Sequence, residues 1–295
     1  MAVISTIEQS YVDQFNANLV LLLEQGYSKF RGTVDEMEVT GEGASRDRVG
    51  SVNSDSTSTM NRITSRHSDT EAREIPHSRR WLYPLTYDEA TYLDKVDQVK
   101  MLADPKGAYV RRHAGVIGRT LDTIILEALV GTAVAGQRGG SSVALPSGQE
   151  IVHGGVGFTL AKLLEAREKM EIDEVEDGIT RYLAVNPKAI TDLLNEDKLT
   201  NADYTTVMAL QAGKITSFMG FEFIRTNRLP LVSTGISKCI AWTPGAAVLG
   251  IAAEPATRAD LRPDKRYMWQ LYSWMSAAAV RLEEERVVEI QVDHS

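Results

Sequence analysis

Apolar residues recur with helical spacing in one long stretch near the middle of the chain. At steps of three and four come Val110, Ala114, Ile117, Leu121 and Ile124. This spacing places side chains on one face of an α-helix. Asp104 is a candidate N-cap, Pro105 fits the first helical position, and Gly131 is a stop signal. The pattern predicts a helix over 105–130, roughly 40 Å long at about 1.5 Å per residue, with those five apolar residues facing a core.

Weaker patterns predict further helices and strands around this helix. Helical spacing or capping residues indicate helices at 4–25, after Thr159, after Asn186-Pro187 and at 202–213. Strands are indicated by RYLAV, FEFIRT, KCIAW, AAVLGIAAE and RVVEIQV. RYMWQLYSWMSAAAVRL fits both patterns, and its aromatic content favours a strand. This mixed order predicts an α+β fold, without the regular βα alternation of a doubly wound fold.

The stretch from Arg46 to Arg80 cannot build a core of its own. It has five sizeable apolar side chains, and it carries seven arginines, five acids and no lysine. Connections in compact domains usually run to about 4–6 residues. Such a stretch is therefore either disordered or ordered by something outside its own chain. Two short pieces in it, DRVGSV and MNRITSR, could pair as a long, thin hairpin.

Composition and charge narrow the class of protein. Apolar residues make up 43% of the 295 residues, enough for a sizeable core, and the formal net charge is −8. This acidic balance is not that of a protein whose main surface grips nucleic acid. The N-terminus lacks the pattern of a signal peptide, and no apolar run approaches the roughly 20 residues of a membrane span. We expect a soluble, intracellular protein in which Cys239, the single cysteine, is a free buried thiol.

No catalytic or metal-binding pattern stands out. The five histidines, at positions 67, 77, 113, 153 and 294, lack the close spacing of a zinc pair. The acids from Asp88 to Asp97 could supply a general acid and base, but a solvated face is the better interpretation. The run Glu283, Glu284 and Glu285 forms either a turn or an acceptor patch for arginines of another chain. The sequence therefore predicts no catalytic residue, no metal site and no cofactor, and hence a protein that is not an enzyme.

A series of segments resembles, in order, one known family. It begins with IPHSRRWLYPLTYDEATYLDKVDQVKMLADPKGAYV and GRTLDTIILEALVGTA. It continues with SVALPSGQEI, FTLAKLLEAREKM, NPKAITDLLN, ADYTTVMAL, FEFIRTNRLPL and LEEERVVEIQV. This set resembles the major capsid proteins of tailed double-stranded DNA bacteriophages, over about 46–292. No single motif is diagnostic, so the ordered set carries the resemblance.

The resemblance implies an α+β fold of the Hong Kong 97-like capsid type. An N-terminal arm would cover 1–40, and an extended loop hairpin, the E-loop, would cover 41–80. A peripheral domain would cover 81–158, including a spine helix at 105–130. An axial domain would cover 159–252, and 253–295 would return to the peripheral domain as strands. The ambiguous segment near the C-terminus is then a strand.

The resemblance also implies a function. The chain would bind itself in hexamers and pentamers and form an icosahedral shell around phage double-stranded DNA, which it would contact weakly and non-specifically. Scaffolding and portal proteins would be partners, with a cement protein as a further candidate. Maturation of the rounded precursor shell would move the arm and the E-loop. The protein would reside in the virion capsid after assembly in the bacterial host cytoplasm, with no contact with a membrane.

The polar stretch would then lie across the neighbouring subunit. Its arginines would meet acids of the next chain, because a planar guanidinium can hold a carboxylate with two hydrogen bonds. The E-loop contains no lysine, so we expect no lysine crosslink from it. The candidate inter-subunit residues are Arg46, Arg48, Arg62, Arg66, Arg73, Arg79, Arg80, Glu283, Glu284 and Glu285.

Two other functions stay open. An encapsulin, a bacterial compartment of the same fold, would hold protein cargo instead of nucleic acid. A soluble hydrolase would use the acids from Asp88 to Asp97 as its active site, but it would leave the polar stretch unexplained.

Overall fold

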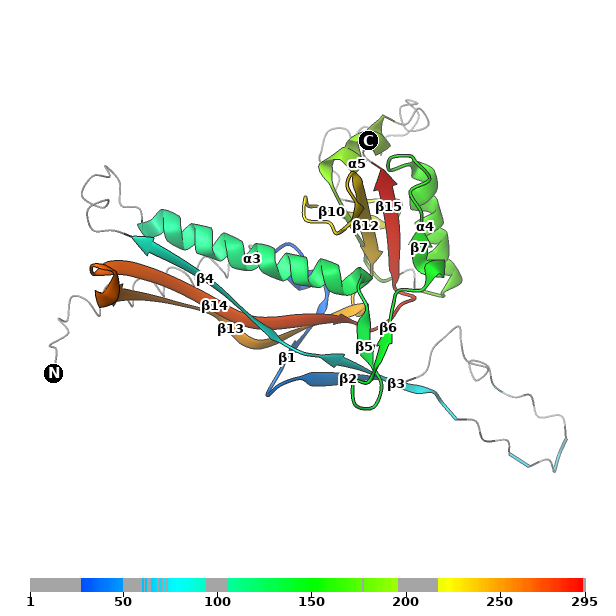
Figure 1. Cartoon of the computed structure of the whole chain (residues 1–295). Coiled ribbons are helices and arrows are strands. Elements are labelled where there is room, and N and C mark those ends of the chain that lie inside the picture. Colours follow the sequence, from blue (N-terminus) through cyan, green and yellow to red (C-terminus); the bar gives the residue numbers. More distant parts are fainter. Residues whose placement is uncertain are drawn as a thin grey trace.

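The computed structural model describes residues 28–49, 60, 62, 65–67, 69–70, 72, 74–93, 106–176, 178–195 and 217–293. The helices predicted at 4–25 and 202–213 lie outside these residues, as do Asp104 and Pro105. The described chain is extended, with two lobes (Figure 1). Long strands beside one helix form the first lobe, a second sheet with two helices forms the other, and a third, small sheet lies near their junction.

Helix α3 (Lys106–Val130) lies along one face of a four-stranded sheet in the first lobe (Figure 1). In order, the strands are β1 (Asp35–Glu38), β13 (Ala247–Arg262), β14 (Met268–Arg281) and β4 (Leu85–Leu93). β13, β14 and β4 pair antiparallel, and β1 joins β13 in parallel. The 3₁₀ helices η1 (Arg31–Thr33) and η3 (Pro263–Lys265) precede β1 and β14.

The ambiguous aromatic segment is the strand β14, as the resemblance implied. Leu271, Ser273, Met275 and Ala277 are buried, while the residues between them are half-buried. This alternation is that of a strand with one face on a core. The helical spacing was misleading because residues four apart in a strand also share a face.

The buried face of α3 is wider than the five predicted positions. Val110, Ala114, Ile117 and Leu121 are buried as predicted. Ile124 is only partly buried, although it packs against the core. The neighbouring side chains Ile125, Leu126 and Leu129 are fully buried. The C-terminal half of α3 also contacts strands of the second lobe, so more than one face of the helix is covered.

The second lobe is built on a seven-stranded sheet. The strands are β7 (Glu150–Ile151), β15 (Val287–Asp293), β12 (Ile236–Trp242), β8 (Arg181–Val185), β10 (Phe221–Arg225) and β9 (Ser217–Phe218), with β11 (Leu231–Ser233) also pairing with β12. Helices α4 (Leu160–Ile172) and α5 (Pro187–Leu194) begin at the predicted caps, because Thr159 and Asn186 each accept a backbone hydrogen bond. The 3₁₀ helix η2 (Ser147–Gln149) precedes β7.

A small third sheet carries the projecting hairpin. Its order is β2 (Ala44–Val49), β3 (His77–Leu82), β5 (Ala133–Ala135) and β6 (Ser141–Val143). The suggested pairing of DRVGSV with MNRITSR is wrong for the described residues 47–49, which pair with 77–79. The turn-rich composition of 50–76 hid a hairpin whose two strands lie far apart in the sequence.

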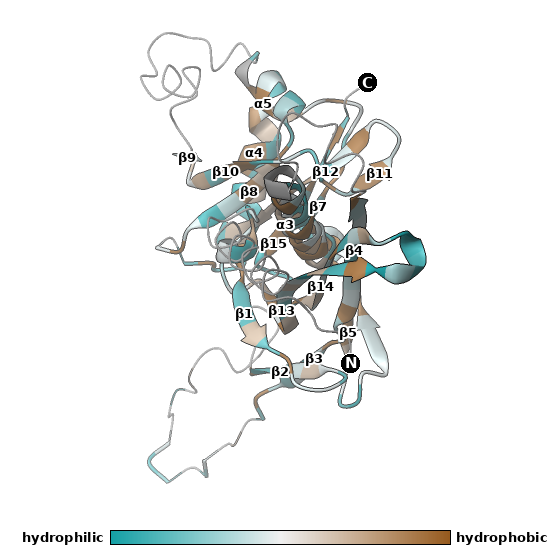
Figure 2. Cartoon of the chain, turned by 90° about the vertical axis from the view of Figure 1, so that its left-hand side faces the viewer, coloured by the Kyte–Doolittle hydropathy of each residue, from teal (hydrophilic) through white to brown (hydrophobic). Residues whose placement is uncertain are grey.

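Three clusters of buried apolar side chains hold these layers together. The main core joins the C-terminal half of α3 to α4, α5 and the seven-stranded sheet. The second cluster, named here the hairpin core, contains Val39, Leu82, Ala133, Val248, Val280 and Leu282. A third cluster lies under the N-terminal half of α3. In Figure 2 the hydrophobic residues gather in the centre, where α3, β14 and β15 lie. No helix within the described ranges is long and apolar enough to span a membrane.

Candidate functional site

The two faces of the β2–β3 hairpin differ because strand residues alternate in direction. Antiparallel pairing sets Arg46 opposite Arg80 and Asp47 opposite Arg79. Arg80 and Leu82 are 5% and 2% exposed, so their face lies against the body of the protein. The face that carries Asp47 and Arg79 points away from it. Each face meets charged groups in a different environment.

Glu284 is the centre of a buried charge cluster on the body-facing side. Its Oε2 accepts a hydrogen bond from Arg48 Nη1 at 2.7 Å, and its Oε1 accepts one from Arg80 Nη2 at 2.8 Å. Glu284 lies in the predicted turn between β14 and β15 and is 7% exposed. Arg48 also reaches Glu285 Oε2 at 3.4 Å. A carboxylate from the body thus binds both strands of the hairpin.

Arg281 connects this cluster to the end of helix α3. Its guanidinium is fully buried and donates to the carbonyl oxygens of Leu129 at 2.9 Å, Gly131 at 2.6 Å and Val143 at 3.1 Å. Its Nε lies 3.7 Å from Glu284 Oε1. A cation at a helix C-terminus binds the carbonyl groups that have no partner within the helix. Burial lowers the pKa of Arg281, and the Glu284 carboxylate opposes that shift.

The outer face of the hairpin carries a second, exposed pair. Arg79 Nη2 donates to Asp47 Oδ2 at 2.9 Å, which lowers the pKa of Asp47. The Arg79 guanidinium also lies 5.9 Å from the ring centre of Trp81, whose Nε1 donates to the carbonyl oxygen of Gly136 at 2.7 Å. Solvent screens an exposed pair of this kind, so it contributes little to stability.

The remaining predicted inter-subunit residues fall into three groups. Arg46 lies 3.7 Å from Asp35, and Glu283 pairs with Arg286, so both have partners in their own chain. Arg62 and Arg66 are exposed, and Arg73 lies outside the described residues. That these arginines meet acids of another chain stays a prediction. For Arg48, Arg79 and Arg80, the acids they meet within one chain were not expected.

Asp122 fixes the start of the described chain to α3, and sequence reasoning missed it. Its Oδ1 accepts hydrogen bonds from Ser28 Oγ at 2.6 Å, Lys29 N at 3.0 Å and Phe30 N at 3.3 Å. Asp122 is 4% exposed, and Phe30 is fully buried in the main core. The local pattern gave no signal for it, because Asp122 follows Leu121 directly and consecutive residues of a helix do not share a face.

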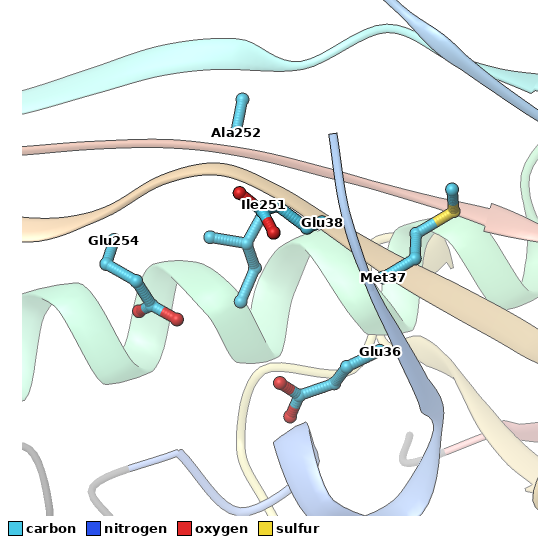
Figure 3. Close-up of a pocket in the computed structure, with 6 residues that line it drawn as sticks. All are labelled: Glu36, Met37, Glu38, Ile251, Ala252 and Glu254. Atoms are coloured by element: carbon cyan, nitrogen blue, oxygen red, sulfur yellow. The ribbon is translucent and has the colours of Figure 1, made fainter. Parts of the chain in front are cut away.

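A groove of about 370 Å³ lies beside β1 and β13 (Figure 3). Met37, Ile251 and Ala252 supply its apolar part, and its acids are Glu36, Glu38 and Glu254. Arg31 Nε lies 3.0 Å from Glu36, and Arg31 Nη2 lies 3.0 Å from Glu254. These hydrogen bonds and charges raise the pKa of Arg31. Two of the three acids, Glu36 and Glu254, are thus already paired with the Arg31 guanidinium of the same chain.

The two predicted acids that the structure describes do not form an acid–base pair. Asp88 and Glu89 are neighbours on β4 and so point to opposite faces of the sheet. Glu89 lies 3.7 Å from Arg112. Asp94 and Asp97 lie outside the described residues. No group of three potential metal ligands occurs in the part of the chain that the structure describes.

Two buried titratable side chains, Cys239 and His113, have surroundings that indicate a structural role and not a catalytic one. Cys239 is a free, fully buried thiol, and burial raises its pKa to about 12. His113 is also fully buried, with Nε2 2.9 Å from Thr91 Oγ1 and Nδ1 2.9 Å from Ser273 Oγ. Burial is the main cause that lowers the pKa of His113. Its imidazole joins α3 to β4 and β14 through hydroxyl groups.

Comparison with known sequences identifies one family. A family model described as phage capsid protein matches residues 7–294. No curated protein sequence matches the chain significantly.

Comparison with solved structures shows the fold. The capsid of the cyanophage P-SCSP1u matches with a TM-score of 0.65 and 16% identity, covering 92% of this chain and 88% of that one. A Mycobacterium phage Che8 structure matches with a TM-score of 0.63 and 16% identity, covering 85% of each chain. The SrpI encapsulin of Synechococcus elongatus matches with a TM-score of 0.55 and 11% identity, covering 89% of this chain and 86% of that one. The fold is therefore α+β and Hong Kong 97-like.

Proposed function

Because the chain belongs to the phage capsid protein family, we propose that it is the major capsid subunit that assembles, as hexamers and pentamers, into an icosahedral shell around phage double-stranded DNA. The family match over 7–294 is the observation that carries this proposal. It is a family of structural proteins and not of enzymes, and its place is the virion capsid. Assembly would take place in the bacterial host cytoplasm.

The shape of the chain supports self-assembly. A hairpin that leaves the body, with exposed arginines at 62 and 66, is suited to contact another molecule. The stretch from Arg46 to Arg80 has two more arginines than acids, whereas the whole chain carries −8. The rest of the chain is therefore net acidic and opposite in charge to this stretch, which favours a heterologous contact between copies. Residues 41–80 would act as the E-loop and 1–40 as the N-terminal arm.

The same proposal assigns the rest of the chain to two domains. Residues 81–158 and 253–295 would form the peripheral domain, and 159–252 would form the axial domain. Scaffolding and portal proteins would guide assembly, and a cement protein is a further candidate partner. The acidic net charge supports weak, non-specific contact with packaged DNA.

Electron microscopy of the purified protein tests this function. The protein is expressed alone and together with the neighbouring genes of its source genome. Closed shells, tubes or rings of hexamers would support a capsid subunit. Small, uniform particles under both conditions would contradict it.

The content of the particles separates the two kinds of compartment. Encapsulins share the fold, so shells alone do not exclude that function. Nucleic acid inside particles made with the neighbouring genes supports the phage capsid, whereas a co-purifying protein cargo without nucleic acid would favour an encapsulin.

A further inference from the structure

Glu284 is placed to bind three arginines from different parts of the chain. Arg48 and Arg80 belong to the two strands of the hairpin, and Arg281 ends β14. Glu284 is 2.7 Å from Arg48, 2.8 Å from Arg80 and 3.7 Å from Arg281. Glu285 is the other carboxylate of the cluster. The three guanidinium groups exceed the two carboxylates by one positive charge, so the loss of Glu284 would leave buried cations close together.

The hairpin has few other attachments to the body. Among the described residues, strand β2 has β3 as its only strand neighbour, and β3 shares two residue pairs with β5. The hairpin core has six buried residues, many fewer than the main core. Apolar packing alone therefore restrains the hairpin weakly. The ion pairs of Glu284 therefore contribute much of the restraint that fixes the direction of the hairpin.

Arg281 extends this restraint to helix α3. Its guanidinium holds the carbonyl oxygens of Leu129 and Gly131 at the helix end, and that of Val143 in β6 of the small sheet. Its Nε and the Nε of Arg80 are buried without a hydrogen-bond acceptor. The nearby negative charge of Glu284 is what compensates these buried cations. Hairpin, turn and helix end are thus joined through one carboxylate.

We infer that Glu284 is a positioning residue for self-assembly: it sets the direction in which the hairpin leaves the body relative to α3. This inference rests on the proposed function, because the hairpin is the part proposed to reach the neighbouring copy. A change in its direction at the base would also move the exposed Arg62 and Arg66, which follow β2 along the chain. Glu284 would therefore control the geometry of the contacts between copies through ion pairs within its own chain.

Hydrogen exchange on unassembled subunits tests the restraint. In Glu284→Gln we expect residues 44–49 and 77–82 to exchange at least about tenfold faster than in the wild type, since opening of the base becomes easier. Strand β12, in the main core, should be unchanged. Glu283→Gln is the matched control, because Glu283 pairs with Arg286 outside the cluster. Wild-type exchange in Glu284→Gln would overturn the inference.

A second substitution that restores the charge balance distinguishes a positioning role of Glu284 from a general loss of structure. Arg48→Gln removes one cation, so the double variant Glu284→Gln with Arg48→Gln should exchange more slowly than Glu284→Gln alone. If Glu284→Gln does not fold, Arg48→Gln by itself should still speed exchange in 44–49. A double variant that is worse than both single variants would contradict the charge balance.

Electron microscopy of the same variants tests the role in assembly. Glu284→Gln should give irregular or open particles, and Glu283→Gln should give normal ones. Faster exchange combined with normal shells would overturn the assembly role. If the wild type makes no shells under any condition, the proposed function fails, while the exchange result still decides whether Glu284 restrains the hairpin.

Discussion

Replacing Asp122 with alanine should release the segment around Ser28–Phe30 from helix α3. One carboxylate oxygen accepts three hydrogen bonds, two of them from backbone N–H groups. Alanine leaves these donors without an acceptor, and the N–H of Phe30 is buried. The main-core position of Phe30 then depends mainly on its apolar packing.

The expected cost follows from the number and kind of these hydrogen bonds. A hydrogen bond to a charged group contributes about 1.5–3 kcal/mol. The three bonds share one oxygen and are not additive, so we expect a loss of about 2–4 kcal/mol in the free energy of unfolding. If the segment detaches, the lost burial of Phe30 would account for about 1.5–3 kcal/mol of this. Asp122→Asn keeps an acceptor oxygen without the charge and should lose about 1–2 kcal/mol.

Urea unfolding and hydrogen exchange of the unassembled subunit measure this effect. Exchange in residues 28–34 should rise in Asp122→Ala, with an intermediate rise in Asp122→Asn. Glu127→Ala is the control, because Glu127 is an exposed acid on the same helix and its loss should stay within about 0.5 kcal/mol. If Asp122→Ala matches this control in both measurements, the anchoring role assigned to Asp122 is wrong.

Three further changes test other parts of the structure. Replacing 50–76 by a two-residue Asn-Gly turn should leave a folded subunit that makes no normal shells in electron microscopy, and normal shells would exclude this segment from assembly. The lowered pKa of His113 means that the unfolded chain binds more protons, so the free energy of unfolding should fall as pH drops below 6.5 towards the folded-state pKa. His113→Gln should reduce this pH dependence in urea titrations and exposed His67→Gln should not; equal slopes would refute the assignment. Gly250→Ala would place a Cβ 2.5 Å and 2.7 Å from side chains of the hairpin core, at a cost of about 1–3 kcal/mol. Gly148→Ala, with open space around it, should be neutral in the same thermal melts, and equal effects would mean that the hairpin core accepts the methyl group.

Local sequence patterns were sufficient to predict those helices and strands whose spacing and capping residues all indicate the same structure. The long helix, the caps at Thr159 and Asn186, and the buried strands RYLAV and KCIAW all carry their own spacing and end signals. These signals act over a few residues, so the chain itself displays them. The family resemblance added the strand assignment of β14, where spacing alone was ambiguous.

Only the tertiary structure decided which distant charges meet. Arg48 and Glu284 are separated by 236 positions, and Ser28 and Asp122 by 94. Neither pair leaves a local signal, because any arginine in a polar stretch could meet any acid. The arginines were predicted to meet acids of another chain, and four of them, Arg46, Arg48, Arg79 and Arg80, already lie beside acids of their own chain. The reason is physical: pairing depends on the path of the backbone, which brings the base of the hairpin against the turn between β14 and β15 and so buries charges that must then be compensated.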